Sequence, residues 1–237
     1  GTAYIYIEDL AITTRTTNGR AIITCLVNIV NETVASAKME LHIDIVHGSR
    51  IIGKSAEFET PAGANSKVNI DITIEHAQLW SPDTPALYTA GASIKNNDEV
   101  IDDVAERFGI RTINAEGEKI LLNGKPLYIK GVHRYDNYGR LGTTVPEKLL
   151  REELALMKSV GINLIRVHYP LTPNLLSLYD EYGFMMMEEV PLNWWGNNME
   201  QSLEILKQAK PVLTKMIKRD KNHPCVIIWR MSNECVT

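Results

Sequence analysis

Polar and charged side chains follow four short apolar segments in the second half of the chain. In chain order they are His133, Arg134, Asp136, Arg166, His168, Glu188, Glu189, Asn233 and Glu234. If the apolar segments are parallel strands, their carboxyl ends lie at one edge of a sheet, and these side chains would converge on a single mouth. Each residue alone has an ordinary structural explanation. Their recurrence at four successive strand ends indicates a site for acid-base chemistry.

Glu234 is the strongest candidate for a catalytic acid. It follows the apolar segment "CVIIW", and a carboxyl group in a partly desolvated mouth has a raised pKa because burial disfavours its charged form. Such a group acts as an acid near neutral pH. A plain solvated carboxylate is an equally good interpretation. Structural alternatives also stay open for its neighbours, because Arg166 could pair with Glu188 or Glu189. His168 could be an ordinary loop histidine.

Trp194 and Trp195 follow the third apolar segment, in "PLNWWG". Exposed aromatic planes beside a polar mouth suit the apolar faces of sugar rings, although packing under a loop explains each tryptophan equally well. The sequence contains no HExxH motif or other tight spacing of metal ligands. We therefore expect no metal and no cofactor.

From about residue 113 onward, short apolar strands alternate with helical segments, which is typical of parallel βα units. The expected strands are "KPLYIKGV", "INLIRVHYP", "FMMMEEV" and "CVIIW". Helices are expected over "VPEKLLREELALMKSVG", over "TPNLLSLYDEYG" and over residues 199–221, where Pro211 should kink or divide the helix. The pattern predicts the first four βα units of a TIM (β/α)8 barrel. A whole barrel would need about 250 residues.

Up to about residue 112 the sequence has the period-two pattern of antiparallel strands. Apolar and polar residues alternate in residues 39–45, 68–75 and 88–95. Turn segments such as "TNGR", "HGSR" and "SPDTP" separate the runs. About seven strands in roughly 100 residues predict an immunoglobulin-like β-sandwich. The expected domains are therefore this sandwich over residues 1–112 and the amino-terminal half of a barrel over residues 113–237.

The composition of the 237-residue chain, with 44% hydrophobic and 23% charged residues, is that of a globular protein. The formal net charge is −4 and the basic residues are scattered, so no nucleic-acid partner is expected. Three cysteines are too few for a disulfide framework. Neither a membrane span nor a signal peptide is recognisable, so we expect no membrane partner. The localisation stays open between the cytoplasm and the periplasm or exterior.

Six segments, taken in order, resemble the landmarks of glycoside hydrolase family 2, the group of β-galactosidases, β-glucuronidases and β-mannosidases. They are "LWSPDTPALYTA", "ERFGIRTI", "LLNGKPLYIKGVHRYDNYG", "NLIRVHYP", "LYDEYGF" and "RDKNHPCVIIWRMSNE". The resemblance runs from about residue 78 to the last residue. The earlier strands fit, by pattern only, the immunoglobulin-like domain that precedes the barrel in this family.

The resemblance implies a retaining mechanism, in which two glutamates about 5 Å apart act as acid/base and nucleophile. By this match Glu234 is the acid/base, and Asn233 hydrogen-bonds the sugar 2-hydroxyl. Arg166 and His168 match positions that line the sugar pocket, and Asp136 matches an acidic position after the first strand. His133, from the same expected mouth, is a further candidate for substrate binding.

Two departures from the family pattern bear on function. Asn193 and Trp195 stand where magnesium-binding β-galactosidases have Glu and His, so no magnesium site is expected. The family's nucleophile lies on the seventh barrel strand, whereas this chain stops after the fourth. We therefore expect part of a glycosidase for a carbohydrate substrate, with little or no activity alone. The competing hypothesis is a non-catalytic carbohydrate-binding or assembly module, whose open half-barrel associates with a second copy or with a separate carboxyl-terminal half.

Overall fold

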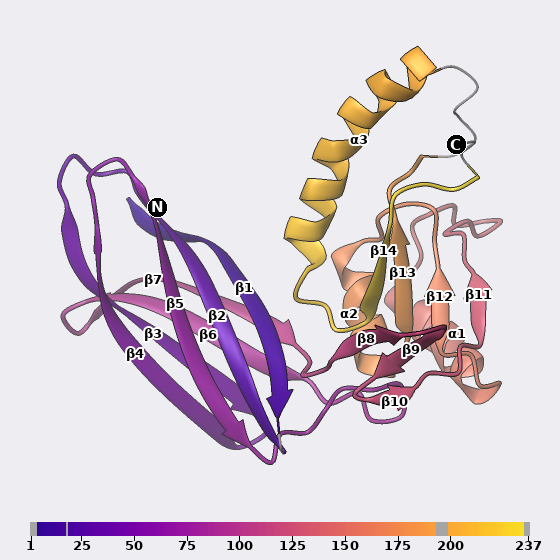
Figure 1. The fold of residues 1–237 in the computed structure, drawn as a ribbon, viewed down its shortest axis with the longest axis horizontal. Helices are drawn as coiled ribbons and strands as arrows, with labels where there is room; N and C mark the ends of the chain where they lie inside the picture. Colours follow the sequence, from indigo (N-terminus) through magenta and orange to yellow (C-terminus); the bar gives the residue numbers. More distant parts are fainter. Residues whose placement is uncertain (1–3, 18, 193–198, 235–237) are drawn as a thin grey trace. The chain divides into compact units, whose positions relative to one another are not determined.

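The computed structural model of the chain describes residues 4–17, 19–192 and 199–234, with the side chains of residues 199–204 left undescribed (Figure 1). Over these residues, no helix combines the length and the apolar character needed to cross a membrane.

The chain forms two compact units. Gly1–Leu79 and Ala86–Thr112 make up the first, and Trp80–Pro85 and Ile113–Thr237 make up the second. The short segment that begins at Trp80 thus interrupts the first unit in sequence but packs with the second. The Trp80 side chain is fully buried, and its indole Nε1 donates a hydrogen bond to a backbone oxygen of the second unit.

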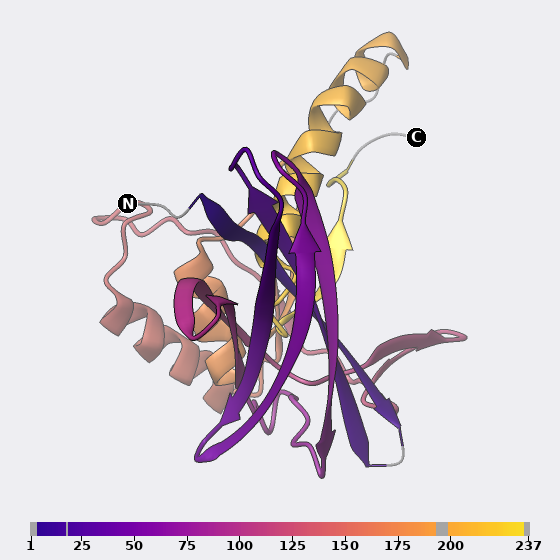
Figure 2. The ribbon, with the colours of Figure 1, turned by 90° about the vertical axis from the view of Figure 1, so that its left-hand side faces the viewer.

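The first unit is a β-sandwich of two antiparallel sheets, with strand orders β1-β2-β5 and β4-β3-β6-β7 (Figure 2). Its strands are β1 Ile5–Thr17, β2 Arg20–Asn31, β3 Ala37–His47, β4 Arg50–Thr60, β5 Asn65–Glu75, β6 Tyr88–Asn96 and β7 Glu99–Phe108. The alternation of apolar and polar residues gives each strand one buried face, as expected. In β3, for example, Leu41, Ile43 and Ile45 are buried in the core shared by the two sheets. The predicted amino-terminal β domain is therefore confirmed.

The second unit contains a small antiparallel sheet and a parallel sheet with helices. The small sheet has the order β10-β9-β8, formed by β8 Ile113–Glu116, β9 Lys119–Leu122 and β10 Lys125–Pro126. The parallel sheet has the order β11-β12-β13-β14, formed by β11 Gly131–His133, β12 Leu164–Arg166, β13 Met185–Glu189 and β14 Val226–Arg230. The helices are α1 Glu147–Ser159, α2 Pro173–Tyr182 and α3 Met199–Asp220, one between each pair of successive parallel strands. This is a partial α/β region.

The ends of α2 follow the sequence signals. Thr172 is the N-cap and Pro173 is the first helical residue, where its missing N–H costs no hydrogen bond. Gly183 ends the helix in a left-handed conformation, with φ of 69°. A Cβ atom on Gly183 would lie 2.5 Å from the backbone oxygen of Pro82, so this position also requires glycine for space.

One expectation for the second unit is wrong, and another is wrong in part. The segment "KPLYIKGV", predicted as one strand, contributes to two sheets, because Lys125–Pro126 pairs antiparallel with β9 whereas Gly131–His133 pairs parallel with β12. Residues 127–130 between them belong to neither strand. In addition, α3 continues past Pro211, so of the two expected effects of this proline the division of the helix is wrong. Proline removes one backbone hydrogen bond from a helix, and the turns on both sides keep theirs.

Candidate active site

The carboxyl ends of the four parallel strands bring one row of polar side chains together. The register pairs His133 with Arg166, and Glu189 with Arg230; paired residues in neighbouring strands point to the same face of a sheet. Arg166 Nη1 lies 3.0 Å from His133 Nε2, and Arg166 Nη2 lies 3.1 Å from Glu189 Oε2. Arg230 Nε is 3.3 Å from the same Glu189 oxygen. We call these four residues the mouth row.

Glu189 is the centre of the mouth row. Its side chain is fully buried and lies between the guanidinium groups of Arg166 and Arg230. The other carboxylate oxygen, Oε1, is also buried and has no hydrogen-bond partner among the described residues. Of the two ion pairs that the sequence left open for Arg166, the structure has the one with Glu189.

Asn233 is tied to the mouth row, and Glu234 follows it. Arg166 Nη2 donates a hydrogen bond of 2.5 Å to Asn233 Oδ1, and the backbone N–H of Asn233 donates to the oxygen of Leu192 at 2.8 Å. Asn233 is 4% exposed. Glu234 has a left-handed backbone conformation, with φ of 50°, and its side chain is exposed. The partial burial expected of Glu234 is therefore not observed, because the residue stands beyond the end of β14.

His168 extends the site beside the first two strands. Its Nδ1 lies 3.0 Å from the hydroxyl oxygen of Tyr135, and its ring meets that of His133 edge to face, with centroids 5.3 Å apart. Burial lowers the pKa of His133, and the positive charges of Arg166, His168 and Arg230 lower it further. A neutral His133 can accept a hydrogen bond from Arg166 through Nε2.

Asp136 belongs to a separate cluster built around Arg134. The Arg134 side chain is 5% exposed; its Nε lies 2.9 Å from Asp136 Oδ1 and its Nη1 lies 2.8 Å from Glu153 Oε1 on α1. Its Nη2 donates to the hydroxyl of Tyr138, which in turn donates to Glu153. The backbone N–H of Asp136 donates to the hydroxyl of Tyr169 at 2.7 Å. These contacts fix Asp136 just beyond the first parallel strand.

Glu188 points away from the mouth row, toward the end of α3. Glu188 and Asp220 are both fully buried, and Arg219 lies beside them, with its Nη2 3.8 Å from Glu188 Oε1 and its Nε 2.7 Å from Asp220 Oδ1. Burial, together with the carboxylate of Asp220, raises the pKa of Glu188 to about 8. The expectation that all nine strand-end side chains converge is thus wrong for Arg134, Asp136 and Glu188. Glu188 and Glu189 are successive residues of β13 and point to opposite faces, whereas Arg134 reaches Glu153 on α1 with Asp136 held beside it.

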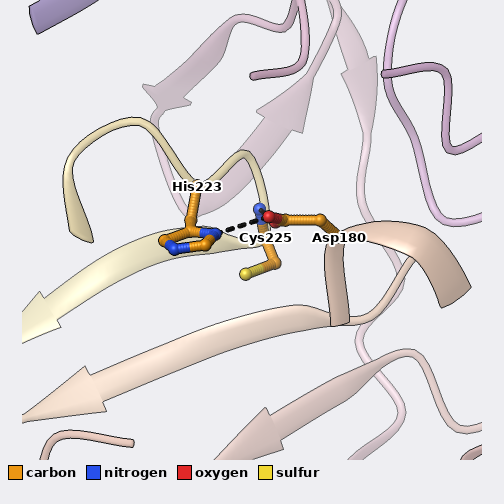
Figure 3. Close-up of side chains that lie close together, drawn as sticks. All are labelled: Asp180, His223 and Cys225. Carbon is orange, nitrogen blue, oxygen red and sulfur yellow. Dashed lines mark hydrogen bonds and ion pairs between the residues drawn. The ribbon is translucent and has the colours of Figure 1, made fainter. Parts of the chain in front are cut away.

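A second cluster of ionisable side chains lies where α2 ends and β14 begins. Potential ligand atoms of Asp180, His223 and Cys225 are all within 4.8 Å of one another. His223 Nδ1 is 2.5 Å from Asp180 Oδ2, and the backbone N–H of Cys225 donates to Asp180 Oδ1 at 2.9 Å (Figure 3). Ligands that share one zinc ion at about 2.0–2.3 Å lie roughly 3 Å or more apart. The 2.5 Å contact is therefore a hydrogen bond, and this cluster ties the helix to the strand.

Trp194 and Trp195 lie outside the described residues.

The sequence did not single out Arg230 or Tyr135, both of which contact the predicted site residues. A signal for Arg230 was available, because it is a charged residue at the end of the apolar run "CVIIW" and stands at even spacing from Val226 and Ile228. Tyr135 carried no comparable signal.

Models of one enzyme family match both parts of the sequence. The model described as glycosyl hydrolases family 2, TIM barrel domain, matches residues 113–237, and the one described as glycosyl hydrolases family 2 matches residues 5–111. A curated β-galactosidase from Pectobacterium atrosepticum is 28% identical over 206 residues, which make up 82% of this chain and 20% of the relative.

Solved structures of the same family resemble the fold. A glycosyl hydrolase family 2 member from Bacteroides cellulosilyticus is 27% identical and aligns with 99% of this chain and 32% of its own, with a TM-score of 0.90. A β-galacturonidase from Eisenbergiella tayi, solved with galacturonate, is 26% identical to this chain. The alignment covers 99% of this chain and 41% of the β-galacturonidase, with a TM-score of 0.88. The chain therefore spans about a fifth of the curated relative and less than half of these solved ones.

Proposed function

The chain belongs to glycosyl hydrolases family 2, and we propose that it carries the general acid/base of a retaining glycosidase that cleaves terminal β-glycosidic bonds. The observation that supports this most is the hydrogen bond from Arg166 to Asn233. It links the Asn233–Glu234 pair to the mouth row, so the proposed acid lies next to the polar groups that sugar hydroxyls can bind.

Glu234 has two tasks in the proposed reaction. It first gives a proton to the glycosidic oxygen while a nucleophile attacks the anomeric carbon, and it then takes a proton from the water that hydrolyses the glycosyl-enzyme. Its exposure is compatible with contact to substrate and water. The nucleophile belongs to a later barrel strand outside these residues. The 237-residue chain alone therefore has little or no hydrolytic activity.

The mouth row and Asn233 bind the sugar. Because Asn233 Oδ1 accepts from Arg166, the amide NH2 group of Asn233 is the part that donates to the sugar 2-hydroxyl. That contact strengthens as charge develops on the sugar ring in the transition state. Arg166, His133 and His168 line the pocket around the sugar.

Three further residues complete the proposed substrate site. Asp136, fixed by Arg134 and by the hydroxyl of Tyr169, forms hydrogen bonds to substrate at the rim. Trp194 and Trp195 stack on the apolar faces of sugar rings, a contact for which the flat apolar indole ring is suited.

The two halves of the chain have different roles in this proposal. Residues 1–112 form an immunoglobulin-like β-sandwich, and residues 113–237 form the amino-terminal half of a (β/α)8 barrel. The four parallel strands with a helix between each successive pair support the barrel assignment. The polar row at their carboxyl ends also supports it, because active sites of such barrels lie at that face.

The test uses 4-nitrophenyl β-glycosides and the protein expressed from its complete coding sequence. Wild-type protein should hydrolyse at least one of a panel of galactoside, glucuronide and mannoside. Glu234→Gln should lower kcat/KM for the corresponding methyl β-glycoside, whose leaving group needs a proton, by about 100-fold or more, in the range of general acid catalysis. Glu106→Gln, a carboxylate of the sandwich, is the matched control and should have no effect. Full activity of Glu234→Gln would exclude Glu234 as the acid/base.

A non-catalytic assembly or carbohydrate-binding module is the second candidate, and the sheet topology supports it. In the described parallel sheet, β11 and β14 are the two edge strands, and unpaired strand edges favour association. Light scattering on the 237-residue chain tests this candidate. A dimer, or a complex with a separately expressed carboxyl-terminal half, would favour association; a monomer with a cooperative melt would count against it.

A further inference from the structure

The β-sandwich contains a cavity of about 190 Å³ that plays no part in the proposed glycosidase site. Both sheets line it, because Ile74 belongs to β5 whereas Ile45, Ile52 and Tyr88 belong to β3, β4 and β6. Ile45 and Ile74 are each 2% exposed, and Tyr88 is 4% exposed. These side chains give the cavity an apolar lining, which disfavours a fully hydrated ion because its polar groups would lose water without gaining partners. The cavity therefore suits a ligand with an apolar body.

The polar part of the lining is basic. It consists of His47, Arg50, His76 and Gln78, and it includes no carboxylate among the described residues. Arg50 Nη1 donates a hydrogen bond to the backbone oxygen of Glu75 at 3.0 Å, and over the described part of the chain Arg50 has no ion pair. The Glu75 side chain is itself paired with Arg20, whose Nε lies 2.9 Å from Glu75 Oε1. The remaining N–H groups of the Arg50 guanidinium can therefore serve an anionic ligand.

The Tyr88 hydroxyl is a second donor at the cavity. It accepts a hydrogen bond of 2.8 Å from the backbone N–H of Gln78, and within the described residues its own hydrogen has no acceptor. Burial raises the pKa of Tyr88, whereas the bond from Gln78 and the charge of Arg50 lower it. The charge of Arg50 thus reaches the Tyr88 hydroxyl, and both groups favour an anion at the same place.

The His47 ring holds this arrangement in place. It stacks on the ring of Tyr88, with centroids 4.3 Å apart and planes inclined by 25°. Its Nδ1 lies 2.9 Å from the carbonyl oxygen of Leu87, and its Nε2 lies 3.3 Å from Gln78 Oε1. Both nitrogens of the ring are therefore engaged, so the Tyr88 ring is fixed from one side and the cavity is preformed, as ligand pockets usually are.

We propose that this cavity is a binding site for a small carboxylate with an apolar body, such as an arylacetate. The apolar body lies among the three isoleucines, and the carboxylate accepts hydrogen bonds from Arg50 and from the Tyr88 hydroxyl. Pockets for drug-sized ligands occupy about 300–1,000 Å³, so this smaller cavity takes a ligand of one ring or a short chain. The inference does not depend on the proposed glycosidase, because all the lining residues belong to the first unit.

Isothermal titration with three probes tests the proposal on protein expressed from its complete coding sequence. Phenylacetate has both features, 2-phenylethanol lacks the charge, and acetate lacks the ring. Phenylacetate should bind with a Kd of about 1 mM or lower, as expected for a fragment-sized ligand. Each of the other two probes should bind about 10-fold or more weakly, because each loses either the charge-assisted hydrogen bonds or the buried apolar area. The preference for phenylacetate over 2-phenylethanol should weaken as salt rises.

Variants identify the residues responsible. Arg50→Gln should weaken phenylacetate about 10-fold or more and leave 2-phenylethanol unchanged. Tyr88→Phe keeps the ring and removes the hydroxyl, and should weaken phenylacetate by about 3- to 10-fold. Arg15→Gln, which removes an exposed arginine from another strand of the sandwich, is the matched control and should have no effect. If Tyr88→Phe does not fold, the exposed Arg50 and the comparison of the probes decide the outcome.

Three results would overturn the inference. Equal affinities for phenylacetate and 2-phenylethanol would remove the role of the carboxylate. Phenylacetate binding that Arg50→Gln retains in full would locate the ligand elsewhere in the protein. Absence of binding by phenylacetate at concentrations up to about 10 mM would exclude the site for this class of ligand.

Discussion

Asp180→Asn should destabilise the second unit strongly, although the residue lies at the opposite end of β14 from the mouth row. Asp180 is 1% exposed, and both of its carboxylate oxygens are engaged, one with His223 Nδ1 at 2.5 Å and the other with the backbone N–H of Cys225 at 2.9 Å. Asparagine keeps one acceptor for Cys225 but places an uncharged amide against His223. The hydrogen bond that joins α2 to the start of β14 is then lost or weakened.

The size of the effect follows from burial. A hydrogen bond to a charged group contributes about 1.5–3 kcal/mol, and the His223 side chain is only 16% exposed, so water compensates little of the loss. We therefore expect a loss of about 2–3 kcal/mol, which corresponds to a fall in Tm of roughly 5–10 °C for a unit of this size. Asp180→Ala should cost about 1–3 kcal/mol more, because it also leaves the buried N–H of Cys225 without its acceptor.

Tryptophan fluorescence during urea unfolding measures this effect selectively, because all four tryptophans of the chain belong to the second unit. Glu181→Gln is the matched control on the same helix. Glu181 Oε2 lies 3.0 Å from Arg151 Nη1, but both side chains are about a third or more exposed, so its loss should cost less than about 1 kcal/mol. An Asp180→Asn protein that unfolds within about 0.5 kcal/mol of wild type would refute the reasoning.

Three further predictions concern other buried groups. The pKa of Glu188 is raised to about 8 in the folded state. The stability that the protonated Glu188 side chain contributes is therefore complete below its ordinary pKa and is lost as pH rises through about 8. Urea unfolding at pH 6 and pH 9 should show this loss in wild type and not in Glu188→Gln. Gly183→Ala should cost about 2 kcal/mol or more in the same assay, because φ is 69° and the new Cβ would meet the backbone of Pro82. Burial raises the pKa of Cys25 to about 12, so a thiol reagent at pH 8 should label Cys25 only after unfolding, and labelling of the native chain would contradict its burial.

The order and type of the sandwich strands, the parallel strands and the helices could be predicted from local sequence patterns. The short antiparallel strands β8 and β9 and the division into sheets could not. Helix α2 was predictable because Thr172, Pro173 and Gly183 each act within one turn. The two short strands on either side of residues 127–130 were not separable, because their apolar residues look continuous while their pairing partners lie in different parts of the chain. Strand pairing depends on distant residues, and no local pattern reports it.

The candidate site was predictable by residue type and only partly by geometry. Counting polar residues after apolar strands identified Arg166, Glu189 and Asn233, which do meet. The same count included Glu188, which faces α3, because a strand-end position alone does not say to which face a side chain points. The register of the parallel sheet supplies that information, and it also adds Arg230 to the row.

The dependence of kcat/KM on the leaving group tests the central claim, that Glu234 is the general acid, most directly. A leaving group of low pKa, such as 2,4-dinitrophenol, departs without protonation, whereas an alkyl alcohol needs a proton from the acid. In protein from the complete coding sequence, Glu234→Gln should therefore retain glycosylation of the enzyme by 2,4-dinitrophenyl glycosides, seen as a burst of released phenol, and lose hydrolysis of methyl glycosides by about 100-fold or more. An equal loss on both substrates, or no loss on either, would contradict the assignment of Glu234.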